Sequence, residues 1–148
     1  MSPNLTDPSW DAEVDAGGAV LRAVRLARHA GASRLAANLY ELECGAAVSP
    51  LHFHHANEEL LFVLAGTPTL RRGDGDERTL APGEVVSFPA GPAGAHQILN
   101  RSAQAARVLI CATNNLPEVA EQVVTATLAV ITESGLRLLP DAPSADAA

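Results

Sequence analysis

Three histidines and one glutamate lie in two short segments bounded by glycine and proline, and no other feature constrains the fold of this chain as strongly. The first segment contains His52 and His54, then Glu59 after four intervening residues, and leads into an apolar stretch that ends at Gly66. The second segment is rich in glycine and proline and contains His96. Imidazole and carboxylate groups are ligands of transition metals, so the two segments together supply a complete ligand set. A fold that uses this set must bring both segments to one point.

The spacing in the first segment indicates a strand followed by a turn. Side chains two residues apart on a strand point to the same side, so His52 and His54 can converge on one ion. Residues 56–57 favour a turn, after which the chain can place a carboxylate beside the imidazoles. We expect Glu59 to take that position, with Glu58 as the alternative.

The two segments resemble the two sequence motifs of the cupin superfamily. The first cupin motif is a glycine, a His-x-His pair, a glutamate and a closing glycine, and the second is Gly, Pro, Gly, His and Asn. The matching positions are His52, His54, Glu59, Gly66, Gly83, Pro89, Gly91, His96 and Asn100. A wider resemblance, to small single-domain bacterial cupins mostly of unassigned function, extends from roughly Leu35 to Thr113.

Two positions depart from the cupin pattern. Gly45 lies one residue further from His52 than is usual, and four residues separate Gly91 from His96 where two are typical. The ligand positions are unaffected by either departure. We therefore expect unusual loops at the mouth of the cavity, and the substrate specificity of relatives does not carry over to this chain.

The resemblance implies an all-β fold, a single double-stranded β-helix or jelly-roll barrel, in which His52, His54, Glu59 and His96 bind one divalent transition metal ion. Many short predicted strands separated by glycine and proline turns independently favour a jelly roll. A small barrel has room for one ion and a small ligand. The ligand types suit Zn, Fe, Mn, Ni or Cu and do not identify the metal.

We expect one cupin domain with an arm and a tail. Residues 1–18 are predicted to form an extended N-terminal arm docked through Trp10, residues 19–139 the cupin domain with motifs at 45–66 and 83–100, and residues 140–148 a mobile C-terminal tail. Within the domain we expect a hairpin turn at 73–76 and a type II turn at 81–84. We also expect a helical turn that begins within 114–118 and runs through Gln122. The predicted strands are residues 20–28, 34–43, 60–65, 67–72, 85–88, 96–99, 107–112 and 123–131.

The apolar stretch at residues 60–65 predicts a strand with two buried faces, because both sets of alternating side chains are apolar. Leu61 and Val63 share the face of Glu59 and belong to the core. The opposite set, which includes Leu60, must be covered by the N-terminal arm or by a second subunit. We therefore predict a homodimer.

The composition fits one soluble domain with a sizeable core, since the 148 residues are 47% apolar and 18% charged. The formal net charge is −7 and all ten basic residues are arginine, so neither nucleic acid nor an anionic membrane is an expected partner. The absence of lysine excludes Schiff-base chemistry. No apolar run reaches the ~18 to 20 residues that cross a bilayer, and residues 1–10 lack the apolar core of a signal peptide, so we expect a cytoplasmic location.

The remaining cysteines and histidines, and Asn100, are expected to have roles other than binding the metal. Cys44 and Cys111 lack a Cys-x-x-Cys spacing, so we expect two buried free thiols, with an approach of Cys44 to the metal as the alternative. His55 is left out of the site as a residue that either faces solvent or supports the ligands without binding the ion, and His29 as a residue that faces solvent. Asn100 is expected to stabilise its own turn by hydrogen bonding.

The cupin resemblance implies a metal pocket without choosing a reaction, since cupins with this ligand set include isomerases, dioxygenases and decarboxylases. Our leading hypothesis is a metal-dependent enzyme, an isomerase or a dioxygenase, that acts on a small polar metabolite able to chelate the ion. Tyr40 and Gln97 are candidate hydrogen-bonding groups around it. The motif region offers no general base beyond Glu58, His55 or metal-bound hydroxide, so no catalytic residue is assigned. The alternative is a non-catalytic module that binds or senses a small molecule, with a structural metal or none.

Overall fold

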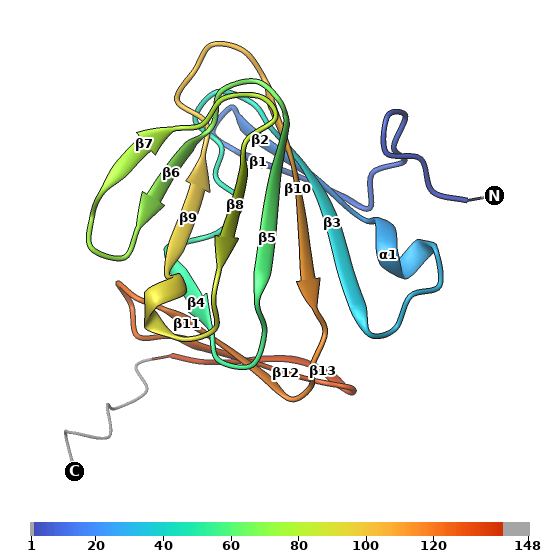
Figure 1. The fold of residues 1–148 in the computed structure, drawn as a ribbon, viewed down its shortest axis with the longest axis vertical. Helices are drawn as coiled ribbons and strands as arrows, with labels where there is room; N and C mark the ends of the chain where they lie inside the picture. Colours follow the sequence, from blue (N-terminus) through green and yellow to red (C-terminus); the bar gives the residue numbers. More distant parts are fainter. Residues whose placement is uncertain (1, 141–148) are drawn as a thin grey trace.

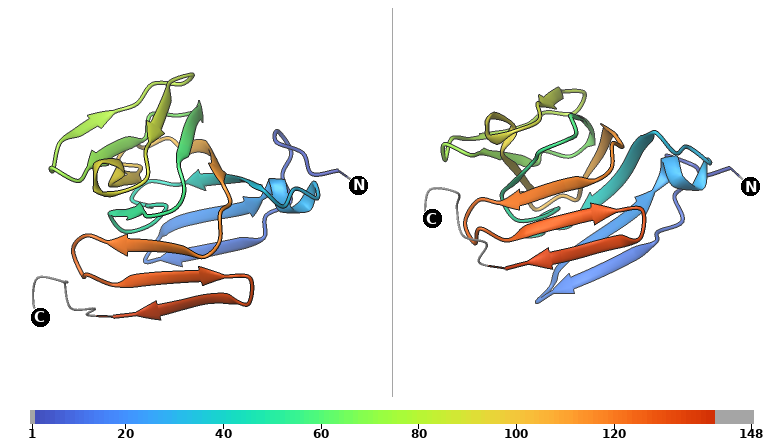
Figure 2. Two further views of the ribbon diagram at one scale, coloured as in Figure 1. Left: turned by 60° about the horizontal axis from the view of Figure 1, so that its bottom comes forward. Right: turned by 90° about the horizontal axis from the view of Figure 1, so that it is seen from below.

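The computed structural model describes residues 2–140, and nearly all of their regular structure is β-strand in two antiparallel sheets that face each other (Figures 1 and 2). The helical elements among these residues are α1 (Leu26–His29) and the 3-10 turn η1 (Pro92–Gly94). The predicted all-β jelly-roll class is confirmed. Within residues 2–140, no helix has the length and apolar character that crossing a bilayer requires.

Each sheet contains strands that are distant from one another in the sequence. The six-stranded sheet has the spatial order β1 (Ala12–Ala16), β2 (Ala19–Arg25), β3 (Leu35–Leu42), β10 (Ala106–Thr113), β5 (Glu59–Ala65) and β8 (Val85–Phe88). The seven-stranded sheet has the order β13 (Gly135–Leu139), β12 (Leu128–Thr132), β11 (Glu118–Gln122), β4 (His52–His54), β9 (His96–Leu99), β6 (Thr69–Arg72) and β7 (Glu77–Thr79). The chain therefore passes repeatedly from one sheet to the other, as a jelly roll requires.

The space between the sheets is a packed core at one end and a cavity at the other. On β3, Leu42 is fully buried in the apolar core, whereas Asn38 lines the cavity. On β5, Leu61 is fully buried in the same core, whereas Glu59 at the start of the strand lines the cavity. Alternate residues of a strand share a face, so one inward face supplies both regions.

Two predicted turns are confirmed. Residues 73–76 connect β6 to β7, which pair as an antiparallel hairpin. At residues 81–84, the Glu84 N–H donates to Ala81 O over 3.1 Å, and Gly83 has a φ of 88°. This is the positive φ that a type II turn places at its second central residue, where glycine has no Cβ to obstruct it.

Three local predictions are corrected by the structure. The predicted strand at 123–131 begins only at Leu128, because residues 123–127 connect β11 to β12. The predicted helical turn through Gln122 is wrong, because residues 118–122 form β11. This strand pairs with β4 on one side and with β12 on the other. Its backbone groups therefore find their partners in the sheet and not within a helical turn. The predicted strand at 20–28 ends at Arg25, and residues 26–29 form α1.

The N-terminal segment packs on the six-stranded sheet. The Arg107 guanidinium of β10 lies 5.6 Å from the centre of the Trp10 ring, so this tryptophan contacts the sheet. Further along, residues 12–16 form β1, which pairs with β2 at the edge of the sheet (Figure 2). Beyond residue 140, the predicted mobile tail lies outside the described residues.

The prediction that residues 60–65 are buried on both faces is wrong for a single chain. Leu61 and Val63, on the inner face of β5, are 0% and 2% exposed. Leu60 and Leu64, on the outer face, are 38% and 39% exposed. A single chain therefore leaves the outer side of this strand in contact with solvent, because the N-terminal segment packs over other strands of the sheet.

Asn100 links the turn after β9 to the end of β3 by hydrogen bonds. It is fully buried, and its Nδ2 atom donates to Leu42 O at 2.9 Å and to Gln104 O at 2.7 Å. Its Oδ1 atom accepts the Ser102 N–H at 3.0 Å and the Ser102 hydroxyl at 2.8 Å. The predicted turn-stabilising role is confirmed, because this buried amide makes hydrogen bonds with both of its polar atoms.

We expect Asn100→Ala to lower the free energy of unfolding by about 1–3 kcal/mol, since it removes the buried amide that donates to Leu42 O and that shares Gln104 O with the Ser102 hydroxyl. Denaturant unfolding of the metal-free protein measures this loss. Ser102→Ala is the matched control, because it removes one hydroxyl bond to the same side chain at a less buried position. Equal losses in the two variants would contradict the role assigned to Asn100.

Candidate metal centre

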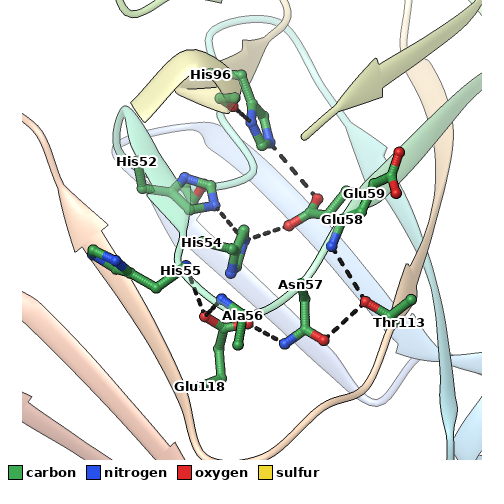
Figure 3. A network of polar contacts seen from close by, with 12 residues as sticks. His52, His54, His55, Ala56, Asn57, Glu58, Glu59, His96, Thr113 and Glu118 are labelled. Carbon is green, nitrogen blue, oxygen red and sulfur yellow. Dashed lines mark hydrogen bonds and ion pairs between the residues drawn. The ribbon is translucent and has the colours of Figure 1, made fainter. Parts of the chain in front are cut away.

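The candidate site lies between the two sheets, and each sheet supplies part of it (Figure 3). The seven-stranded sheet supplies His52 and His54 from β4 and His96 from β9, and the pairing of His52 with His96 places these strands side by side. The six-stranded sheet supplies Glu59, the first residue of β5. The pleat of β4 directs both of its histidines to the same side, as their spacing predicted.

Three of the four predicted ligands form a compact group. Single donor atoms of His52, His54 and Glu59 all lie within 4.8 Å of one another. The Nε2 atoms of His52 and His54 are 3.1 Å apart, and His54 Nε2 contacts Glu59 Oε1. His96 adjoins the group through the other carboxylate oxygen, with its Nε2 atom 3.7 Å from Glu59 Oε2. The fold thus brings residues from both motifs to one place.

Backbone carbonyls orient two of the imidazoles. His52 Nδ1 lies 2.8 Å from Pro50 O and 3.0 Å from Ser49 Oγ, and His96 Nδ1 lies 2.8 Å from Gly94 O. A carbonyl oxygen only accepts hydrogen bonds, so the proton of each neutral ring resides on Nδ1. The Nε2 lone pair is then left facing the cluster, which is how metal-binding histidines are commonly held.

The irregular loop before His96 helps to hold its ring. Residues 92–94 form η1, which takes up the additional residues of the second motif. A Cβ atom at Gly94 would lie 1.9 Å from Pro89 O, so this turn requires glycine. On β8, the Phe88 ring stacks on the imidazole with 3.6 Å between ring centroids and 9° between their planes.

The charges of the cluster follow from burial and contact. Burial alone would raise the pKa of Glu59, but the His54 contact and the neighbouring imidazoles lower that pKa below its usual 4.5. Burial alone would lower the pKa of His54, but Glu59 raises it above 6.5. Burial lowers the pKa of His52 and lowers that of His96 to about 4. His52 and His96 are therefore neutral at pH 7, as metal ligands must be.

A cavity of about 260 Å³ opens beside the cluster. Besides the four predicted ligands, its polar lining consists of Asn38, Tyr40, Ser49, Asn57, Thr113, Asn114 and Glu118. Its apolar lining consists of Ala36, Val48, Ile98, Ile110, Ala112 and Ile131. Burial, and then the nearby negative charge of Glu59, raise the pKa of Tyr40 above 10, so its phenol remains protonated and can donate a hydrogen bond to a ligand. The cavity thus suits a small molecule with several hydroxyl or carbonyl groups.

Several residues considered from the sequence lie away from the cluster. Glu58 is exposed and does not line the cavity, so Glu59 takes the carboxylate position. The His55 ring is 47% exposed and lies 3.1 Å from Glu121. His29 is also exposed. The choice to leave both histidines out of the site agrees with their positions.

Two other expectations are corrected. Gln97 does not line the cavity, because it follows His96 on β9 and points to the other side of the sheet, where its amide donates to Ser49 O at 3.1 Å. Cys44 is exposed and not buried, and it lies outside the cavity lining, whereas Cys111 is partly buried on β10.

Glu118 was not identified from the sequence as part of the site. It is 3% exposed and lines the cavity together with Asn57 and Thr113. No sequence signal marks it, because it stands in a polar segment after β10 and only the pairing of β11 with β4 carries it to the ligands.

Comparison with known families confirms the resemblance seen in the motifs. Residues 38–112 match the family model of the cupin domain. The chain belongs to the cupin family. The match includes all four predicted ligands, the strands β4, β5 and β9, and most of β3 and β10. No curated protein matches this cupin.

Solved structures resemble this cupin over most of its length. A sugar phosphate isomerase of the cupin superfamily from Silicibacter pomeroyi has a TM-score of 0.77 and 29% identity, and the match covers 85% of this chain and 82% of that one. A provisionally assigned sugar phosphate isomerase from Acidithiobacillus ferrooxidans has a TM-score of 0.75 and 26% identity, covering 85% and 81%. The polyketide cyclase RemF from Streptomyces resistomycificus, at 22% identity, TM-score 0.58 and coverage of 86% and 75%, shares the fold.

The low pKa of His96 predicts a specific pH dependence of folding. Its pKa is about 4 in the folded chain against 6.5 for the free side chain, so the unfolded chain binds more protons between these values. The stability of the metal-free protein must therefore fall as the pH is lowered through this window, by about 3 kcal/mol from this residue. His96→Gln keeps a donor for Gly94 O but cannot titrate.

Denaturant unfolding at pH 6.5 and pH 4 in the presence of a chelator measures the effect, with the difference between wild type and His96→Gln isolating the histidine. We expect the wild type to lose more stability on acidification than the variant. Parallel losses in the two proteins would show that burial does not suppress protonation of His96.

Proposed function

We propose that this cupin is a metal-dependent isomerase of a small polyhydroxy carbonyl compound, with His52, His54, Glu59 and His96 holding one divalent Zn, Fe, Mn or Ni ion. The observation that carries the proposal is the convergence of imidazole and carboxylate donors from both sheets at the wall of a polar cavity. Three imidazoles and one carboxylate leave one or two coordination positions open to a ligand.

The donor atoms of these residues fit a metal ion. The Nδ1 atoms of His52 and His96 are engaged by carbonyl oxygens, so their Nε2 lone pairs point into the group. Two such lone pairs and a carboxylate are all acceptors, and a cation satisfies them together. A bound divalent ion would polarise a substrate carbonyl and acidify the adjacent hydroxyl.

The cavity residues would orient such a substrate. Tyr40, protonated because of its raised pKa, can donate to a carbonyl or hydroxyl oxygen. Asn38 and Asn114 offer amide donors and acceptors to further hydroxyl groups. These groups are neutral, so they select hydroxyl and carbonyl oxygens without requiring a charge on the ligand.

The relatives support an isomerase, and the cavity lining restricts its substrate. Two of the similar structures, at 29% and 26% identity, are described as sugar phosphate isomerases. Among the residues that the structure describes, however, no arginine lines this cavity, and the chain contains no lysine. The Glu118 carboxylate, which is not a proposed metal ligand, would repel a phosphate. We propose that the portion of the substrate inside the cavity is a neutral sugar.

A non-catalytic binding or sensing module remains the second candidate, and one observation favours it. Besides the four proposed ligands, the titratable side chains in the cavity lining are Tyr40 and Glu118. Glu118 uses its carboxylate oxygens in hydrogen bonds to the chain, so it is not free to remove a proton. An isomerase needs a base, and a binding module does not.

We expect about one transition metal ion per chain in protein purified without chelators or nickel resin, measured by elemental analysis.

We also expect aldose–ketose interconversion of an unphosphorylated sugar, followed by NMR in D₂O across a panel of free and phosphorylated sugars. Glu59→Gln should abolish turnover while circular dichroism shows an intact fold, because it replaces the buried carboxylate with a neutral amide.

Glu58→Gln is the matched control, since the neighbouring glutamate is exposed and outside the cavity; it should retain both metal and turnover. Substoichiometric amounts of every transition metal in the wild type would refute the metal site. Tight sugar binding by calorimetry without turnover of any panel member would replace the isomerase with the binding module.

We also propose that this cupin forms a homodimer through the outer face of the six-stranded sheet. Leu60, Leu64, Val85 and Leu35 are 38%, 39%, 53% and 62% exposed on this sheet. Leu60 and Leu35 also border a mostly apolar surface hollow of about 400 Å³. A two-fold axis brings the same patch of two copies together, so the exposed apolar side chains of one copy can be buried against those of the other.

Light scattering should give a mass of twice the 15.3 kDa of one chain at micromolar concentration. Leu60→Arg should shift the protein toward monomer by placing a charge in the interface. Val124→Arg, at an 83% exposed position in the turn between β11 and β12, is the control and should leave the mass unchanged. A single-chain mass for the wild type would rule the dimer out.

A further inference from the structure

We propose that Glu118 is a positioning residue that clamps the crossing between β4 and β5 and thereby sets the separation of His54 and Glu59. This inference rests on the metal site proposed above. The crossing consists of residues 55–58, which leave the seven-stranded sheet after His54 and enter the six-stranded sheet at Glu59. Any change in its shape alters the distance between two proposed ligands.

Glu118 is a buried carboxylate that is satisfied by the crossing itself. It is 3% exposed, and its Oε1 atom accepts the N–H groups of His55 at 3.0 Å and Ala56 at 3.1 Å. Its Oε2 atom accepts a hydrogen bond from Asn57 Nδ2. Charge-assisted bonds of this kind are the strong ones, and a buried carboxylate is costly without them. The carboxylate therefore binds three successive residues of the crossing.

Asn57 extends the clamp to the opposite sheet (Figure 3). Its Oδ1 atom accepts the Thr113 hydroxyl at 2.9 Å and the Asn115 N–H at 2.7 Å, and its Nδ2 atom also donates to Asn115 O at 3.1 Å. Thr113 Oγ1 in turn accepts the Glu58 N–H at 3.2 Å. Thr113 ends β10 in the six-stranded sheet, so the network joins both sheets across the crossing.

The clamp forms hydrogen bonds with the backbone directly beside each proposed ligand. The N–H of His55, one residue after His54, is shared between Glu118 Oε1 at 3.0 Å and Val119 O at 2.9 Å. The N–H of Glu58, one residue before Glu59, donates to Thr113 Oγ1. Metal–ligand distances are fixed to a few tenths of an ångström, so a site of this kind needs ligands that are held in place before the ion binds. Glu118 reaches the cluster through these backbone contacts, and we assign it no contact with the ion.

The test measures the affinity of the protein for Co(II), by titration against a competing chelator and by the visible spectrum of the bound ion. Glu118→Gln keeps the shape of the side chain but places an amide N–H₂ against a donor of the crossing. We expect about ten- to hundredfold weaker Co(II) binding and an altered ligand-field spectrum, the range typical when a group that orients a metal ligand is removed.

A double-mutant cycle probes the contact itself. Asn57→Asp alone sets one carboxylate against another and should weaken binding at least as much as Glu118→Gln. Combining Glu118→Gln with Asn57→Asp restores a donor opposite an acceptor, so the double variant should regain part of the lost affinity. Losses that simply add would contradict a direct role for this contact in positioning the ligands.

Glu41→Gln is the matched control, because Glu41 is a partly buried glutamate on the outer side of β3, where it pairs with Arg22 and Arg107. It should change the free energy of unfolding without changing Co(II) affinity. Unchanged affinity in Glu118→Gln, with only a loss of folding stability, would overturn the positioning role while leaving the metal site in place. A wild-type protein that binds no Co(II) would overturn the proposed metal site and this inference together.

Discussion

The contact of one buried carboxylate with imidazoles from the facing sheet is the interaction on which the site depends. Glu59 belongs to the six-stranded sheet, whereas His54 and His96 belong to the seven-stranded sheet. A buried carboxylate is unfavourable unless charged or polar partners compensate it, so the two sheets must keep a fixed spacing at this end of the fold. That spacing creates the cavity. It also makes the geometry of the site depend on the crossing after β4, which joins His54 in one sheet to Glu59 in the other.

The strands use a single inward face for two purposes. At one end that face carries leucine and valine side chains, such as Leu61 and Val108, which pack to full burial. At the other end the same face carries Asn38, Tyr40 and Glu59, and the sheets enclose a cavity. The apolar core holds the sheets together, so the polar end can keep open space without collapsing.

Local geometry explains both the successes and the failures of sequence-based prediction. The alternation of side chains along a strand placed His52 and His54 on one face, and glycine and proline chemistry located the turns at 73–76 and 81–84. The same local reasoning produced a helical turn where β11 lies, because the partners of that strand are distant in the sequence. It also treated Gln97 as a neighbour of the site, although pleat alternation turns it away from His96.

The choice between Glu58 and Glu59 shows where local reasoning stops. Either glutamate follows the turn at a suitable distance, and the register of β5 decides that Glu59 faces inward. Glu118 illustrates the same limit more strongly. Its role arises from the pairing of β11 with β4, which places a carboxylate from a polar segment against the N–H groups of the crossing.

By itself, the sequence determined the all-β class, the cupin motifs and the types of donor atoms, because each of these depends on residue identity and short-range spacing. Only the tertiary structure decided which glutamate joins the histidines, which polar groups line the cavity and what holds the crossing in place. Those features depend on strand register and on contacts between residues far apart in the chain, and the free energy of packing two sheets together selects them.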